Sequence, residues 1–144
     1  MPKSTSACNS ILALICNGTA WADLAENDSS SPITNLYLSL HTADPGVGGS
    51  QETNEATFTG YARLPVVRTT SGWAVPSGGA TENAALAQFD ECTGSSNIIT
   101  YVGIGKSVSG AGLMLYSGPL ADARTISAGI QAQFAAGALV LTET

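Results

Sequence analysis

The chain has 144 residues, of which 44% are hydrophobic and only 11% charged, and its formal net charge is −6. This length and hydrophobic content suit one globular domain, and no apolar run reaches the roughly 18 residues needed to cross a bilayer. The first residues lack the apolar segment of a secretory signal, and the five basic residues are too scattered for the basic stripe that binds nucleic acid. We therefore expect a protein made in the cytoplasm, with no membrane and no nucleic-acid partner.

The scarcity of charge predicts a protein that works in an assembly. Ordinary soluble domains carry about 25% charged residues, whereas Ser, Thr, Gly and Ala fill much of this sequence. A surface of small neutral side chains suits repeated burial against other copies or against a larger body. The alternative is a weakly charged monomer.

Residues 4–17 are predicted to form a helix that starts at a Ser or Thr cap and ends before Gly18. Its apolar stripe consists of Cys8, Ile11, Leu12, Ile15 and Cys16. The two cysteines would lie about 12 Å apart along this helix, which is too far for a disulfide. With Cys92 the chain has three cysteines, and we expect buried free thiols, as in a reducing cytoplasm. A short helical turn is predicted within 19–26, followed by a loop at 27–32.

The clearest strand signal spans residues 35–41, where leucines alternate with Tyr, Ser and His. That period of two is typical of a strand with one face in a core. The turn residues Asp44, Pro45 and Gly46 follow, and they begin a polar loop at 44–57. A loop of this length is more often functional than idle, so we expect an interaction loop that orders against a neighbour, with a flexible surface loop as the alternative.

The remainder is predicted to be β throughout, with short strands separated by turn signals. The expected strands are 61–69, 73–75, 80–83, 86–89, 98–104, 113–116, 130–134 and 139–142, with Ile126 as an isolated strand residue. Pro65 places the first of these at a sheet edge or bulge. The pattern indicates a β-sandwich or barrel in a single domain of residues 1–144, with a helical segment at 1–26 and the β body at 33–144.

No catalytic, metal or cofactor motif is found in the sequence. His41 is the only histidine, and neither a triad partner at suitable spacing nor a GxSxG elbow accompanies it. The cysteines and His41 fit no zinc pattern, the carboxylates lack calcium-loop spacing, and the glycines at 103 and 105 lack the spacing of a phosphate-binding loop. Sugar stacking on Trp21, Trp73 or a tyrosine is a weaker possibility than core packing. We expect no enzyme and no cofactor.

Several segments together resemble a family of small structural proteins of tailed bacteriophages and prophages. The most specific is LHTADPG at 40–46, and the others are TNEA at 53–56, GYAR at 60–63, GIG at 103–105, SGAG at 109–112, LYSG at 115–118 and FAAGAL at 134–139. The resemblance spans nearly the whole chain.

The resemblance implies a capsid decoration, or cement, protein: a jelly-roll-like antiparallel β-sandwich with an N-terminal helix, on the outer surface of the virion capsid. Its partners would be the major capsid protein and copies of itself, as a trimer or less favourably a dimer, because many weak contacts then act together. Similar sequences are also labelled tail-fibre-like, so a tail or fibre module with possible receptor contact is the alternative. A small hydrolase is a distant third.

The candidate contact residues come from segments without an obvious place in the sandwich and from the few charged residues. A charge in so neutral a chain is more useful facing an acidic partner group than facing water, although simple solubilising residues are equally consistent. The candidates are Lys3, Ser4, Gly48, Gln51, Glu52, Asn54, Arg63, Arg68 and Arg124.

Overall fold

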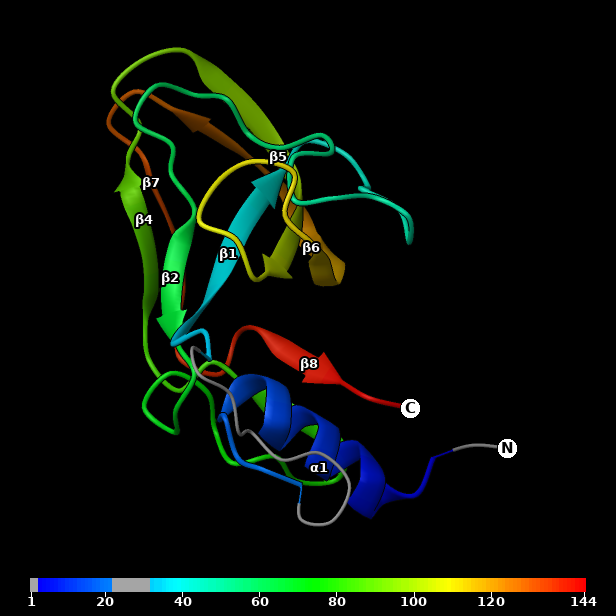
Figure 1. Cartoon of the computed structure of the whole chain (residues 1–144). Coiled ribbons are helices and arrows are strands. Elements are labelled where there is room, and N and C mark those ends of the chain that lie inside the picture. Colours follow the sequence, from blue (N-terminus) through cyan, green and yellow to red (C-terminus); the bar gives the residue numbers. More distant parts are fainter. Residues whose placement is uncertain (1–2, 22–31) are drawn as a thin grey trace. The chain divides into compact units, whose positions relative to one another are not determined.

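The computed structural model describes residues 3–21 and 32–144 (Figure 1). One helix, α1 (Thr5–Cys16), is followed by eight strands: β1 (Asn35–His41), β2 (Leu64–Val67), β3 (Ala80–Glu82), β4 (Ala87–Glu91), β5 (Ser96–Gly105), β6 (Met114–Ser127), β7 (Gln131–Phe134) and β8 (Val140–Thr142). The prediction of a mainly β chain with antiparallel sheets and an N-terminal helix is confirmed.

The chain divides into two compact units that interleave along the sequence. Unit 1 takes its described residues from Met1–Asn35, Val67–Ala87 and Phe134–Thr144, and unit 2 consists of Leu36–Val66 and Gln88–Gln133. The helix therefore shares a unit with the C-terminal strand. A single domain with its division at 1–26 and 33–144 stays a prediction, and the expected helical turn at 19–26 and loop at 27–32 lie largely outside the described residues.

In unit 1, α1 forms where its caps and apolar stripe predict. The Ser4 hydroxyl accepts a hydrogen bond from Ala7 N at 3.2 Å, which satisfies one of the free N–H groups of the first turn. The helix ends at Cys16 with Asn17 as its C-cap, and Gly18 follows with a φ of 63°, a left-handed conformation that glycine adopts without strain. The fully buried residues of the helix are Cys8, Leu12 and Cys16.

The partner of α1 in unit 1 is β3, which pairs antiparallel with β8. Below the helix terminus, Arg68 donates to the carbonyls of Leu14, Ile15 and Ile33 at 2.8, 2.7 and 2.6 Å. Two of these acceptors belong to the last turn of the helix, where the carbonyls have no partner within the helix. Within unit 1, Arg68 therefore ties its own segment to the end of α1.

Unit 2 contains a four-stranded sheet in the order β2-β1-β5-β6 and a two-stranded sheet of β4 and β7. β1 and β5 pair antiparallel with Leu38 opposite Ile104 and Leu40 opposite Val102. The β1 leucines Leu36, Leu38 and Leu40 are all buried, with at most 1% exposed. One face of β1 thus enters the core, as the alternation predicts.

The last long strand differs from the prediction. β6 runs for 14 residues from Met114 to Ser127, whereas the sequence indicated only a strand at 113–116 and Ile126 as an isolated strand residue. β6 lies at the edge of its sheet, where a proline costs no ladder hydrogen bond with an outer neighbour. The described residues form one four-stranded and two two-stranded sheets, so the two-sheet jelly-roll arrangement is not confirmed.

Candidate functional site

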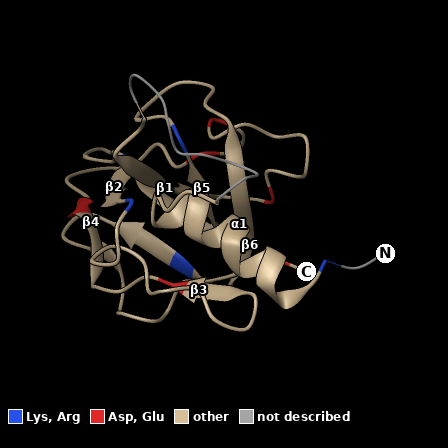
Figure 2. Cartoon of the chain, turned by 60° about the horizontal axis from the view of Figure 1, so that its bottom comes forward, with Lys and Arg blue, Asp and Glu red and all other residues tan. Residues whose placement is uncertain are grey.

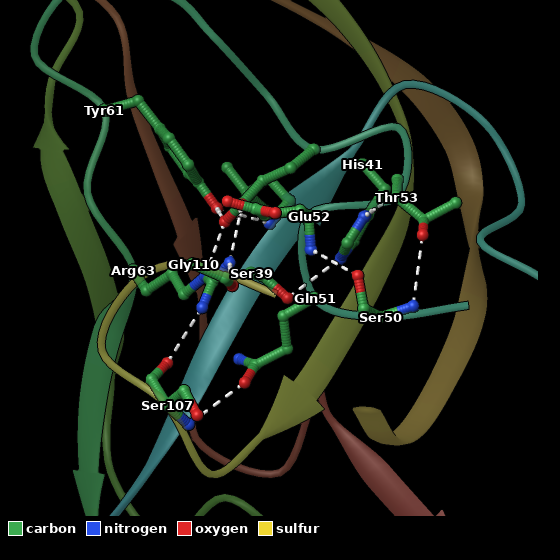
Figure 3. Close-up of polar contacts among 12 residues, drawn as sticks. Ser39, His41, Ser50, Gln51, Glu52, Thr53, Tyr61, Arg63, Ser107 and Gly110 are labelled. Atoms are coloured by element: carbon green, nitrogen blue, oxygen red, sulfur yellow. Dashed lines mark hydrogen bonds and ion pairs between the residues drawn. The ribbon is translucent and has the colours of Figure 1, made fainter. Parts of the chain in front are cut away.

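The second face of β1 is covered, which the sequence did not predict. Ser39 and His41 are 0% exposed, and the loop at 44–57 lies over them (Figure 3). His41 Nδ1 donates to the Thr53 carbonyl at 2.8 Å, so its Nε2 is free to accept from the Ser39 hydroxyl, also at 2.8 Å. Gly103 makes room for this ring, since an added Cβ there would lie 2.7 Å from His41 Nε2.

Gln51 holds the long loop to a second loop at 106–113. Its side chain is 0% exposed, its backbone N donates to the Gly112 carbonyl at 2.9 Å, and its Oε1 accepts from Ser107 N at 3.0 Å. The glycines Gly105 and Gly112 form the slot, because a Cβ on either would collide with the Gln51 side chain. The two loops also meet in a bridge between Ser50 and Leu113. We call residues 44–57 and 106–113 the paired loops.

An internal ion pair completes the attachment. Arg63 donates through Nε and Nη2 to the two carboxylate oxygens of Glu55, both at 2.7 Å, and through Nη1 and Nη2 to the carbonyls of Ser107 and Gly110 at 3.0 and 2.8 Å. Tyr61 donates its hydroxyl to Glu55 at 2.7 Å. The Arg63 side chain is 2% exposed and that of Glu55 14%. One guanidinium thus connects both paired loops.

We call these residues the polar cluster: Ser39, His41, Gln51, Thr53, Glu55, Tyr61, Arg63 and Ser107. Its interior position decides the protonation of its members. Burial lowers the pKa of His41, an effect opposed by its hydrogen bond to the Thr53 backbone and by the Glu55 charge. Burial likewise raises the pKa of Tyr61, and the hydrogen bonds to Glu55 raise the pKa of Arg63. The cluster therefore holds a neutral imidazole, a neutral phenol and one compensated ion pair.

Chemically, the Ser39–His41 contact has the atoms of a nucleophile and a base, but neither side chain reaches solvent. A substrate cannot approach such a pair without moving the paired loops. Among the described residues, no group of His, Cys, Asp and Glu could hold a metal ion, and no helix is long and apolar enough to span a membrane. Trp73 is 0% exposed, so it cannot stack on a sugar.

The outer side of the paired loops, meaning their exposed residues, includes apolar side chains together with the charged residues Asp44, Glu52 and Lys106. Val47 is fully exposed at the tip of the first loop, and more than half of Val108 and of Leu113 is exposed on the second. Gly46 and Gly48 flank Val47, and nothing lies within 4 Å of a Cβ built on either. Exposed apolar side chains commonly form an interaction surface when they lie on loops that buried contacts hold in place.

The structure places the nine predicted contact residues in three kinds of position. Exposed positions are held by Gly48, Glu52 and Asn54 in the long loop, by Arg124 on β6 and by Lys3, whose Nζ lies 3.3 Å from a Glu143 carboxylate oxygen. Gln51 and Arg63 are buried in the polar cluster. Ser4 and Arg68 are occupied at the two ends of α1. As contacts with a partner, all nine stay predictions, although Ser4, Gln51, Arg63 and Arg68 already make contacts within the chain.

Sequence reasoning missed the exposed valines, because a lone apolar residue in a loop carries no periodic signal. It also expected Arg63 to face an acidic group of another protein, whereas Arg63 pairs with a carboxylate of its own chain. Figure 2 shows the few charged residues scattered over the chain, and no stripe of basic residues is present in the part of the chain that the structure describes. The described surface therefore offers a partner neutral and apolar groups together with isolated charges.

A family model described as podophage GP4 fiber I protein gp80 matches residues 2–142, which is nearly the whole chain. No curated protein matches the chain.

Proposed function

This chain belongs to the gp80 family of podophage fiber I proteins, and we propose that it is a non-catalytic fibre module that binds other virion proteins through the outer side of its paired loops. Membership makes the chain a structural protein of a bacteriophage and a component of the virion. The family description fits the fibre alternative at least as well as capsid decoration, which was the first expectation from the sequence.

The observation that carries this proposal is the fixing of the paired loops by the polar cluster. Arg63 and Gln51 each bind both loops, so the two loops are held together before a partner arrives. A surface ordered in advance loses less conformational entropy on binding. The same burial keeps Ser39 and His41 away from solvent, which favours a binding role over a catalytic one.

Capsid decoration is the second candidate, favoured by the scarcity of charge. The number of copies per virion and their position in the particle distinguish a fibre protein from a decoration protein. Immunogold labelling and cryo-electron microscopy of virions should find the protein in small numbers at the tail. Hundreds of copies spread over the head would overturn the fibre assignment and support decoration.

The binding surface is tested by a charge placed at its tip. Val47→Asp should fold normally and fail to enter virions when it is the sole copy supplied during infection. Val75→Asp is the matched control, because Val75 is also highly exposed, at 71%, but lies in unit 1. Equal incorporation of both variants would exclude the paired loops as the attachment surface.

A further inference from the structure

β6 presents a long open edge. It is hydrogen-bonded to β5 on one side, and no other strand pairs with it in the described part of the chain. Its 14 residues far exceed the usual strand length of five or six. Proteins protect such an edge with lysines, prolines or bulges; β6 contains Pro119 and an irregular stretch at 120–123 but no lysine. Its exposed residues include Ala121, Ala123 and Thr125, which are small enough for another backbone to approach.

The register with β5 shows where this edge is most accessible. Ile99 lies opposite Arg124 and Tyr101 lies opposite Pro119, so one β5 residue faces the four β6 residues from 120 to 123. Such an irregularity bends a strand and turns it away from its sheet partner. Pro119 has no N–H to offer to a new neighbour. The segment available for further pairing therefore begins after Pro119.

The charges of β6 fit a second copy of the same strand. Asp122 and Arg124 are its only charged residues. They are 75% and 69% exposed and lie 3.6 Å apart, so both project to the same side of the strand, as an i, i+2 pair does. In an antiparallel pair of identical strands centred on Ala123, Asp122 of each copy stands opposite Arg124 of the other. Directly opposed charges of opposite sign stabilise a strand pair, and like charges destabilise it.

We propose that β6 pairs antiparallel with β6 of a second copy across a two-fold axis at Ala123. The contact joins the four-stranded sheet of one copy to that of the other in one continuous sheet. Ala121 then lies opposite Thr125, and both arginine–aspartate pairs cross the interface. The inference deepens the proposed assembly function, since it names one contact between copies, and it rests on that function only for its place in the virion.

The test is charge reversal in the full-length chain, measured by sedimentation velocity at low ionic strength. Wild type should form a dimer. Asp122→Arg places arginines opposite arginines, and Arg124→Asp places aspartates opposite aspartates, so each variant alone should associate at least about tenfold more weakly. The two variants mixed should recover a heterodimer, because every opposed pair is then of opposite sign. Asp90→Arg, a charge reversal at an exposed position of β4, is the control and should dimerise like wild type.

A monomeric wild type at all concentrations would overturn the contact, and so would a dimer that the single reversals leave unchanged. Misfolding cannot imitate the expected pattern, because two misfolded variants would not restore each other on mixing. These outcomes are independent of the position of the protein in the particle. Labelling of virions tests the fibre role whether or not the β6 contact exists.

Discussion

The ion pair between Arg63 and Glu55 should make one of the largest single contributions to the stability of unit 2. Arg63 makes four hydrogen bonds, two to Glu55 and two to loop carbonyls, and its side chain is 2% exposed. Replacing it by Met keeps the apolar stem and leaves the Glu55 carboxylate beneath the loops without its cation. Breaking a buried pair from one side costs about 3–5 kcal/mol, a large part of the roughly 5–15 kcal/mol by which domains are stable.

Urea unfolding followed by circular dichroism measures this loss, and a double variant identifies its cause. If the stability lost in Arg63→Met comes from the unpaired Glu55 carboxylate, adding Glu55→Leu should recover part of it. Lys3→Met is the matched control, because the Lys3–Glu143 pair lies at the surface and exposed pairs contribute about 0–1 kcal/mol. A cost below 1 kcal/mol for Arg63→Met, or a further loss in the double variant, would refute the role given to this pair.

Four further results are expected. Gly105→Ala should destabilise the protein by about 1–3 kcal/mol, because its Cβ collides with Gln51, whereas Gly118→Ala, with nothing within 4 Å of the new Cβ, should be close to neutral in the same urea titration. Arg68→Ala should cost about 1.5–3 kcal/mol by losing charge-assisted bonds to α1, with helical signal at 222 nm falling earlier in the melt than in wild type. Since the pKa of His41 is lowered on folding, the unfolded state binds the proton more readily, so His41 contributes stability above pH about 6.5 that is lost as the pH falls; unfolding midpoints at pH 7.5 and 5 should differ less in His41→Gln than in wild type. All three cysteines are buried thiols, so a thiol reagent at pH 8 should label none in the native protein and three in urea; rapid native labelling would contradict this packing.

The strand and helix patterns predicted most elements of the fold, because each depends on neighbours close in sequence. They missed the length of β6, and they predicted a strand at 73–75 where the structure has only an isolated bridge at Trp73. The caps of α1 and the leucine face of β1 lie within a few residues of the side chains that cause them. The residues that cover the second face of β1 are instead Thr53 and Gln51, which lie ten to twelve positions after the end of the strand. An alternation of apolar and polar residues in the sequence is the same whether the polar face of the strand contacts water or a polar loop.

The sequence did contain one indication that the second face of β1 is covered. β5 carries Gly103 and Gly105 among β-branched residues, and glycine weakens a strand unless something must approach closely. In the structure Gly103 faces His41 and Gly105 faces Gln51. Glycines two apart in a central strand therefore indicate a face on which other side chains lie flat, although they do not identify those side chains.

The low charge has a consequence for how this protein can bind anything. Four of its five basic residues already have a partner within the chain: Lys3 and Glu143, Arg63 and Glu55, Arg124 and Asp122, and Arg68 with the helix carbonyls. The fifth, Lys106, is exposed in the paired loops, so little positive charge is left to attract an acidic partner at a distance. The exposed pair on β6 is the exception, because its two members can exchange partners with a second copy at little cost.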